Sequence, residues 1–350
     1  MWFMMDAVYG DVAMKPSSGS SSITSMYVLG DSSVDCGDNT LFYPFLRHNL
    51  SLYPCDGSDT SLLPHLLAEH MGLPYASPFY SQNGSIEGLL QGVNFGSAQA
   101  TIMNPISPSH QSLNQQLRQA FETVQLLQLQ LGQETANHFI QSSLFYLSFG
   151  KDDYINLFLQ NSSGLSPNYN GQKLAHILVE QMTHAIKTLY DANVRKIVCM
   201  GILPLGCTPR VLWEGENSRV GDGGSACEEE INELVVEYNI MLEDHIVDLN
   251  VQLADAHIIF CDVYQGIVDI ITYPKDYGFK DVKSACCGLG KYGGMLGCVS
   301  VDMACQQVSA HVWWDFYNPT QSVNSLLAKS IWSGQPLSDI CRPITIHELP

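Results

Sequence analysis

The chain has 350 residues, of which 45% are hydrophobic and 15% are charged, and this composition is typical of a globular protein with a large core. Its 35 acidic residues outnumber its 16 basic residues, which gives a formal net charge of -19 at pH 7. Such a surface repels nucleic acids and anionic membranes, so both are excluded as partners. The sequence also lacks an apolar run of the roughly 18 residues that a membrane-spanning helix needs.

The N-terminal segment, residues 1–24, is predicted to be a flexible leader because residues 16–22 are rich in Ser and Gly. Residues 1–13 contain Asp6 and Asp11, and they lack the basic start and the apolar stretch of a secretory signal. The chain therefore has no recognisable signal peptide. Either the signal is absent or this N-terminus is not the natural one.

Cysteines and sequons favour the opposite conclusion about localisation. The chain contains eleven cysteines, several of them in Gly-rich or turn-like sequence where a disulfide would tie down a loop. Three Asn-x-Ser sequons, at Asn49, Asn83 and Asn161, are candidate glycosylation sites. Both features favour an oxidising environment, so we expect a protein of the secretory pathway or a secreted one. Because eleven is an odd number, at least one thiol is left unpaired.

Short runs of apolar, β-prone residues predict four strands, at residues 26–29, 144–149, 196–200 and 257–260. Each run ends at Gly or Asp, as expected for strands that are buried on both faces. Longer stretches predict helices at residues 113–131, 173–190 and 228–250. Strands that alternate with helices indicate βαβ units and a parallel sheet, whose functional site lies at the carboxyl ends of the strands. We therefore expect the loops at Gly30, Gly150 and Gly201 to converge at that edge.

The remaining segments give the domain organisation. Residues 274–310 are rich in Gly and Cys, and they are predicted to form a long cross-linked loop rather than a domain. No linker divides the chain. We therefore predict a single domain at residues 25–340, followed by a C-terminal tail at residues 341–350.

The first chemical motif is Gly30-Asp31-Ser32-Ser33, which follows the first predicted strand. A serine in a tight turn directly after a strand is well placed to expose its hydroxyl. Its backbone N–H can also help to bind an oxyanion. Taken alone, Gly-Asp-Ser is a common turn sequence, and a simple strand-ending turn is an equal alternative.

Further blocks follow the Ser32 turn in a distinctive order. They are Gly92-Val93-Asn94-Phe95-Gly96-Ser97, Gly150-Lys151-Asp152-Asp153-Tyr154, Leu203-Pro204-Leu205-Gly206-Cys207, Ala285-Cys286-Cys287-Gly288 and Trp314-Asp315-Phe316-Tyr317-Asn318. Together these blocks resemble the plant-type GDSL esterase/lipase family of SGNH hydrolases over residues 26–328. The resemblance implies a flavodoxin-like, three-layer α/β/α fold with a mostly parallel five-stranded sheet. It also implies a Ser-His-Asp ester hydrolase, and we expect no cofactor and no metal.

The resemblance places the catalytic triad on three positions. The family's nucleophile falls on Ser32, its triad acid on Asp315, and the histidine of its Asp-x-x-His motif on Asn318. An asparagine amide cannot accept and return a proton at neutral pH, so Asn318 cannot serve as the general base. Removing the histidine from a serine protease costs about 10⁶ in turnover. The alternative base is His311, four residues before Asp315 on the last predicted strand.

The resemblance also locates an altered oxyanion hole. Ser32 contributes its backbone N–H, two family glycines become Ala98 and Gln99, and the donating asparagine becomes Asp152. An ionised Asp152 has no proton to donate and repels a forming oxyanion. Losing one oxyanion donor costs roughly 10²–10³ in turnover. Glutamine at position 99 keeps a backbone N–H, and it is harmful only if the φ angle of the glycine or the room above it matters.

The cysteines of the last third of the chain have two readings. Cys286, Cys287, Cys298 and Cys305 could form a zinc site, but their spacing lacks a paired Cys-x-x-Cys, and the family uses this region for disulfides. Cys207 and Cys227 also resemble a family disulfide. All six are disulfide candidates, although sequence alone does not prove any pairing.

Two functions follow from these residues. The first is a GDSL-type protein with lost or very weak esterase activity that acts by binding. In it, Asp35, Asp153 and Asp315 persist because carboxylates accept backbone N–H bonds that hold loops at strand ends. The second is an active carboxylester hydrolase, or an acyltransferase, with unusual machinery. Either function implies a small acyl ester or another apolar molecule as ligand, and the sequence identifies no protein partner.

Overall fold

The computed structural model describes residues 23–37, 39, 61–103, 111–156, 171–218 and 227–350. The predicted leader at residues 1–24 therefore lies almost wholly outside the described residues, as do the sequons at Asn49 and Asn161. Within the described ranges, no helix is both long enough and apolar enough to cross a membrane.

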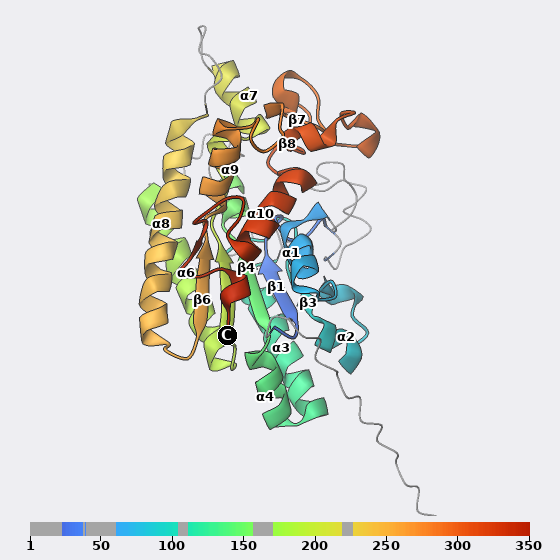
Figure 1. Cartoon of the computed structure of the whole chain (residues 1–350), viewed down its shortest axis with the longest axis vertical. Coiled ribbons are helices and arrows are strands. Elements are labelled where there is room, and N and C mark those ends of the chain that lie inside the picture. The colour runs from blue at the N-terminus through green and yellow to red at the C-terminus, as the bar shows by residue number, and fades with distance from the viewer. Residues whose placement is uncertain (1–22, 38, 40–60, 104–110, 157–170, 219–226) are drawn as a thin grey trace, which may run out of the picture.

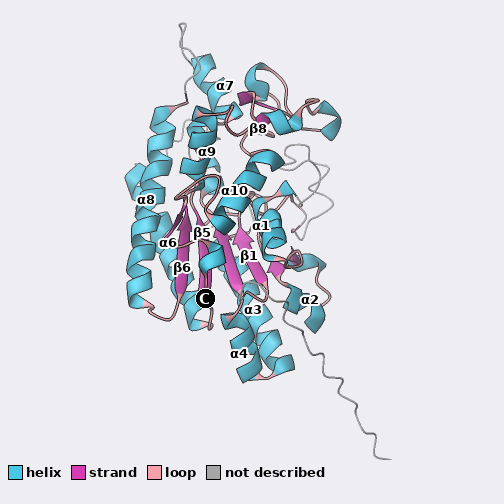
Figure 2. Ribbon diagram, viewed as in Figure 1, coloured by secondary structure: helices cyan, strands magenta, loops and turns pink. Residues whose placement is uncertain are grey.

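The described chain is built on a seven-stranded sheet with the order β2-β3-β1-β4-β5-β6-β9 (Figure 2). Neighbouring strands are parallel except β6 and β9, which pair antiparallel. The strands are β1 (Met26–Gly30), β2 (Ser77–Pro78), β3 (Val93–Asn94), β4 (Leu144–Ser148), β5 (Lys196–Met200), β6 (His257–Cys261) and β9 (Cys341–Arg342). The prediction of a mostly parallel sheet is confirmed, and two-residue strands at its edges extend the predicted five to seven.

Helices cover the sheet on both faces, so the fold is α/β with three layers (Figure 1). One group of packed helices contains α3, α6 and α8, and the other contains α1, α9 and α10. The helices are α1 (Leu63–Met71), α2 (Ile86–Gln91), α3 (Leu113–Leu131), α4 (Gln133–Gln141), α5 (Lys151–Tyr154), α6 (Gly171–Asp191), α7 (Pro209–Ser218), α8 (Glu229–Gln252), α9 (Val263–Thr272) and α10 (Gln321–Ser333). The three predicted helices correspond to α3, α6 and α8.

The core explains why these strands read as continuous apolar runs. Every residue of β1, β4 and β5 is buried, because helices pack on both faces of the sheet. The aromatic rings of Tyr27 and Phe145 stack between β1 and β4, with centroids 5.0 Å apart. Parallel pairing brings the ends of these strands to one edge, with Gly30 opposite Ser148. The loops after β1 and β4 therefore meet, as the sequence predicted.

Residues 341–350 differ from the predicted C-terminal tail. Strand β9 pairs with β6, and the disulfide Cys261–Cys341 joins the same two strands. Beyond β9, Ile346 is fully buried. The physical reason is that apolar side chains in these ten residues complete the edge of the core, so the segment belongs to the domain.

Residues 274–310 contain more regular structure than a loop. Strand β7 (Asp281–Ala285) pairs with β8 (His311–Trp313) in a separate two-stranded parallel sheet. The disulfides Cys286–Cys305 and Cys287–Cys298 close the chain between the two strands. The predicted cross-linking is thus confirmed, and it anchors the strand that leads directly into Trp314 and Asp315.

Disulfides account for most of the cysteines in the described residues. Cys207–Cys227 joins the loop after β5 to the segment before α8, as expected. The pair Cys261–Cys341 was not predicted, because its members lie 80 residues apart and share no motif. Cys199 is the free cysteine of the described chain; it lies buried in β5, and burial raises the pKa of its thiol to about 12.

Candidate active site

The turn after β1 presents Ser32 at the edge of the sheet. Gly30 ends the strand, and a Cβ atom at this position would lie 2.6 Å from both the carbonyl oxygen of Ser148 and a methyl carbon of Val34. Only glycine therefore allows the turn to pass so close to β4. The turn leaves the Ser32 side chain half-buried rather than enclosed, as a nucleophile position requires.

The Ser32 side chain and backbone are both bound by Asp152, the second residue of α5. The Ser32 hydroxyl donates to Asp152 Oδ1 over 2.7 Å, and the Ser32 backbone N–H donates to Asp152 Oδ2 over 3.0 Å. Sequence reasoning placed Asp152 at the oxyanion hole as a repelling charge. The structure places its carboxylate on the hydroxyl and the backbone N–H of Ser32, the groups that the sequence predicted as nucleophile and oxyanion donor.

Asp31 supports this arrangement from inside the fold. Its Oδ2 accepts the backbone N–H of Asp152 over 3.3 Å, while its Oδ1 accepts the N–H and the hydroxyl of Ser33. Asp31 is fully buried, and its pKa is raised to about 6, chiefly by burial and then by the charge of Asp152. The nearby Lys151 charge lowers the same pKa. Asp31 is therefore a positioning group for the turn and not a free acid.

Asn318 holds Asp315 as a triad histidine would, but its other side faces a lysine. The Asn318 amide nitrogen lies 3.0 Å from both oxygens of Asp315, and its backbone N–H donates to Asp315 Oδ1 over 2.8 Å. The amide oxygen of Asn318 accepts from Lys151 Nζ over 2.6 Å. Burial raises the pKa of Asp315, and the bonds from Asn318 oppose this. The Asn318 side chain is thus saturated between Asp315 and Lys151.

Lys151 is the site residue that sequence reasoning missed. Its side chain is buried, with only 4% of the residue exposed, and its charge lowers the pKa of Asp31 and of Asp315. Buried lysines are rare unless they are paired. The available signal was its position between Gly150 and two aspartates, directly after a fully buried strand. That context indicates a lysine at the sheet edge that has carboxylates within reach.

Ala98 and Gln99, which replace two glycines of the family, differ in their backbone environment. Ala98 donates its backbone N–H to Asp35 Oδ2 over 2.8 Å, so in this structure that N–H is directed to a carboxylate. Gln99 has a φ of 64°, in the left-handed region that favours glycine. The change to glutamine is therefore not neutral, because a side chain with a Cβ is held in a conformation that costs free energy.

The remaining aspartates hold loops, as the sequence predicted. Asp35 accepts backbone N–H groups from Gly37 and Asn39 in addition to Ala98. Asp153 accepts those of Ile102 and Met103, which fixes the loop after Gln99 against α5. Asp153 is almost fully buried, and burial raises its pKa to about 8 despite these bonds. Both side chains serve the scaffold around Ser32.

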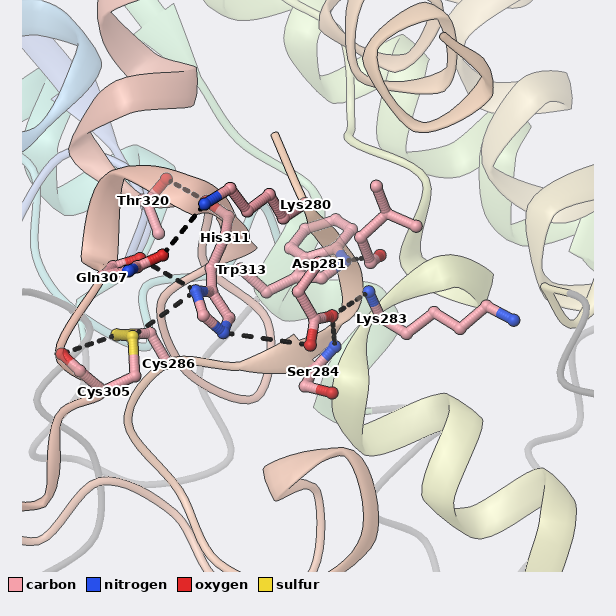
Figure 3. A network of polar contacts seen from close by, with 11 residues as sticks. Lys280, Asp281, Lys283, Ser284, Cys286, Cys305, Gln307, His311, Trp313 and Thr320 are labelled. Atoms are coloured by element: carbon pink, nitrogen blue, oxygen red, sulfur yellow. Dashed lines mark hydrogen bonds and ion pairs between the residues drawn. A yellow bond between two sulfur atoms is a disulfide. The ribbon is translucent and has the colours of Figure 1, made fainter. Parts of the chain in front are cut away.

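His311, the alternative base, interacts with other groups (Figure 3). Its Nδ1 lies 3.0 Å from the carbonyl oxygen of Gln307 and 3.4 Å from Cys305 Sγ, and its Nε2 lies 3.8 Å from Asp281. These partners belong to the cross-linked segment and to β7. His311 therefore serves the anchoring of β8, and the polar contacts of its ring do not include Ser32 or Asp315.

A cavity of about 190 Å³ lies beside this network, between the ends of β4 and β5 and helices α9 and α10. Asp31, Ser33, Lys151 and Asn318 are among the residues that line it. Ser32 is not among the residues that line it. The site thus has two parts, a Ser32 turn bound by Asp152 and a cavity that opens onto Lys151 and Asn318.

Comparisons with known proteins support the family resemblance that the sequence blocks indicated. The family described as GDSL-like Lipase/Acylhydrolase matches residues 26–331. The chain is 31% identical to GDSL esterase/lipase At1g71250 of Arabidopsis thaliana, over 95% of this chain and 90% of that protein. It is 30% identical to GDSL esterase/lipase 7 of the same plant, over 92% of this chain and 91% of that protein.

Proposed function

The chain belongs to the GDSL-like lipase/acylhydrolase family, and from that premise we propose that it hydrolyses esters very weakly or not at all and acts by binding. Its ligand is a small acyl ester or another apolar molecule. The observation that carries this proposal is the double contact of Asp152 with the hydroxyl and the backbone N–H of Ser32.

A serine hydrolase needs both of these groups for catalysis. The hydroxyl must pass its proton to a base as it attacks the carbonyl carbon, and the backbone N–H must bind the oxygen that becomes negative. The Asp152 carboxylate occupies the N–H with an oxygen that is already negative, 3.0 Å away. A second anion at the same place is repelled, and the loss of an oxyanion donor alone costs roughly 10²–10³ in turnover.

The base is the second deficit. Asn318 has no titrating nitrogen, and both ends of its amide are bound, to Asp315 and to Lys151. Losing the histidine costs about 10⁶ in turnover in a serine protease. The losses in turnover from the two deficits do not add, because catalytic groups act as a unit. Either deficit alone is enough for us to expect very slow ester hydrolysis.

An active hydrolase or acyltransferase is the second candidate, and the 2.7 Å contact from the Ser32 hydroxyl to Asp152 Oδ1 is the observation that favours it. Here Asp152 takes the hydroxyl proton while Ser32 Oγ bonds to the acyl carbon, and the proton then passes to the departing alcohol. Water or a second alcohol later takes the acyl group from Ser32. A carboxylate is a weaker base than imidazole, so this route is slow.

We also propose that the protein matures in an oxidising compartment. The four disulfides of the described residues support this, because disulfides persist in secreted proteins and are reduced in the cytosol. The sequon at Asn83 is exposed, as a glycosylated asparagine must be. Mass spectrometry of the protein from a eukaryotic secretory host tests both points.

A fluorophosphonate probe tests the main proposal directly. We expect labelling of the wild-type protein to equal that of Ser32→Ala, and short-chain nitrophenyl esters to be hydrolysed at the rate of that control. A family enzyme with an intact triad gives the positive control. Labelling and turnover that disappear in Ser32→Ala would establish the second candidate instead.

A further inference from the structure

The cavity beside Lys151 is lined by apolar and polar residues. Met200 ends β5, Ile202 and Leu203 follow it, Val263 and Ile267 belong to α9, and Leu327 belongs to α10; all six are apolar lining residues. Asp31, Ser33, Lys151 and Asn318 are among its polar lining residues. A concave site with apolar walls and a few converging polar groups is the usual form of a small-molecule site.

Lys151 offers hydrogen-bond donors to a molecule in the cavity. An ammonium group carries three donors, and Lys151 Nζ has a hydrogen bond to Asn318 Oδ1. A ligand oxygen beside Lys151 can therefore accept a further hydrogen bond from the same ammonium group.

The charges around the cavity select a neutral ligand. The Lys151 ammonium faces Asp31, which lines the same cavity, and it interacts electrostatically with Asp315. An anionic head group at Lys151 would also meet the Asp31 carboxylate. A cationic head group would meet Lys151 itself. A neutral oxygen accepts a hydrogen bond from Lys151 without either repulsion.

The volume limits the ligand to a small molecule. A protein cavity of about 150 Å³ holds benzene, with its six carbon atoms. The 190 Å³ found here therefore fits a compound of roughly eight non-hydrogen atoms.

We propose that this cavity binds a small neutral amphipathic molecule, with a hydroxyl or carbonyl oxygen at Lys151 and an apolar chain against Ile202, Ile267 and Leu327. The cavity adjoins the Ser32 turn, because Asp31 and Ser33 line it, but Ser32 is not among its lining residues. It therefore does not depend on whether Ser32 reacts with esters.

Binding of three compounds of matched length tests the proposal. Isothermal titration and ligand-observed NMR at pH 7.5 measure 1-hexanol, hexanoate and hexylammonium against the full chain with its disulfides intact. We expect 1-hexanol to bind saturably at one site, and the two ions to bind at least tenfold more weakly. Absence of saturable 1-hexanol binding, or an ion that binds as tightly, contradicts the proposal.

Two variants on the same helix locate the site. Ile267→Phe adds volume to a fully buried residue that lines the cavity, so we expect at least tenfold weaker 1-hexanol binding. Ile271→Phe makes the same change one turn later on α9, at a half-buried residue outside the cavity lining, and should bind as the wild type does. Equal effects of the two variants would place the bound alcohol elsewhere.

Lys151→Met tests the hydrogen bond within the site. We expect 1-hexanol to bind about tenfold more weakly to this variant, because its hydroxyl loses a donor. Unchanged affinity would refute the role of Lys151. Should Lys151→Met fail to fold, the pair Ile267→Phe and Ile271→Phe still decides whether the cavity binds. Fluorophosphonate labelling of the same preparations is scored separately, so a reactive Ser32 contradicts only the proposed loss of hydrolysis.

Discussion

The site has two halves, one around Ser32 and one around Asn318, and the polar groups of each half bind partners within that half. On one side, the hydroxyl and N–H of Ser32 are bound by Asp152. On the other, Asn318 is bound by Asp315 and Lys151. In a serine triad a histidine bridges these halves, because its two nitrogens serve the acid and the nucleophile together. Asparagine keeps the contact with the acid, but its second group is a carbonyl oxygen that attracts a lysine.

The halves also differ in how their charges are compensated. Asp315 is bound by an amide and lies near Lys151, so its negative charge has partners on two sides. The Ser32 side contains Asp31, Asp152 and Asp153; burial raises the pKa of Asp31 and Asp153, and the charge of Asp152 raises both further. Burial and neighbouring charge thus act in the same direction on this side. The Ser32 side is therefore where protonation and mutation should have their clearest effects.

The largest expected effect is on the rate of ester hydrolysis, and it comes from a variant that restores a histidine between the two halves. The double variant Asn318→His with Asp152→Asn supplies a base toward Ser32 and replaces an anion with an amide donor. We expect hydrolysis of short nitrophenyl esters to rise at least about 10³-fold over the wild type, since the histidine alone is worth about 10⁶ in a serine protease and an oxyanion donor roughly 10²–10³. Steady-state kinetics measures this. The same double variant carrying Ser32→Ala must stay inactive, and no rise in rate would mean that the turn at Ala98 and Gln99 also prevents catalysis.

Removing the positive charge of Lys151 should destabilise the folded protein. Lys151→Met leaves the amide oxygen of Asn318 without its donor and takes away the cation near Asp31 and Asp315. We expect a loss of about 3 kcal/mol in the free energy of unfolding, because two buried carboxyls lose the cation with which they interact. Urea unfolding measures it. Lys187→Met, an exposed lysine on α6, is the control and should change stability by less than about 0.5 kcal/mol.

Some features of the fold and of the site could be predicted from the sequence, and others could not. The strands were predictable because burial on both faces produces continuous apolar runs. The motifs that follow two strands also singled out Ser32 and Asp315 as predicted site residues. The binding of Asp152 to Ser32 was not predictable, because it depends on the geometry of two turns that lie 120 residues apart. Lys151 lies within the block that follows β4, but the resemblance gave it no role, and its partner Asn318 lies 167 residues away. Pairings over such distances, like Cys261–Cys341, are set by the folded chain.

The pH dependence of stability should report the burial of the carboxyls near Ser32. Asp153 has a pKa of about 8 when folded against an ordinary value of 3.8. Because the folded value is raised, its contribution to stability is complete below about pH 4 and is lost as pH rises to about 8. Asp31 follows the same sign but finishes near pH 6. Between pH 6 and pH 8 we therefore expect a loss of roughly 2 kcal/mol from Asp153.

Asp153→Asn isolates this contribution, because an amide does not titrate. Urea unfolding at pH 6, 7 and 8 should give the variant a flatter curve than the wild type. Asp302→Asn serves as control, since Asp302 is exposed and should leave the curve unchanged. Parallel curves for Asp153→Asn and the wild type would contradict a pKa of Asp153 within this range.

The smallest effect concerns the loop that Asp153 holds beside the Ser32 turn. Gln99 has a φ of 64°, which costs an L-residue about 1 kcal/mol or more, whereas glycine adopts it freely. Glycine also loses more chain entropy on folding, so the net gain of Gln99→Gly should be about 0.5 kcal/mol. Thermal unfolding followed by circular dichroism measures it. Gln125→Gly, on the exposed face of α3, should instead destabilise by about 1 kcal/mol, because glycine in a helix interior is unfavourable. Opposite signs in the two variants attribute the gain at position 99 to its backbone conformation, and a loss at both positions would mean that the glutamine side chain itself stabilises the loop.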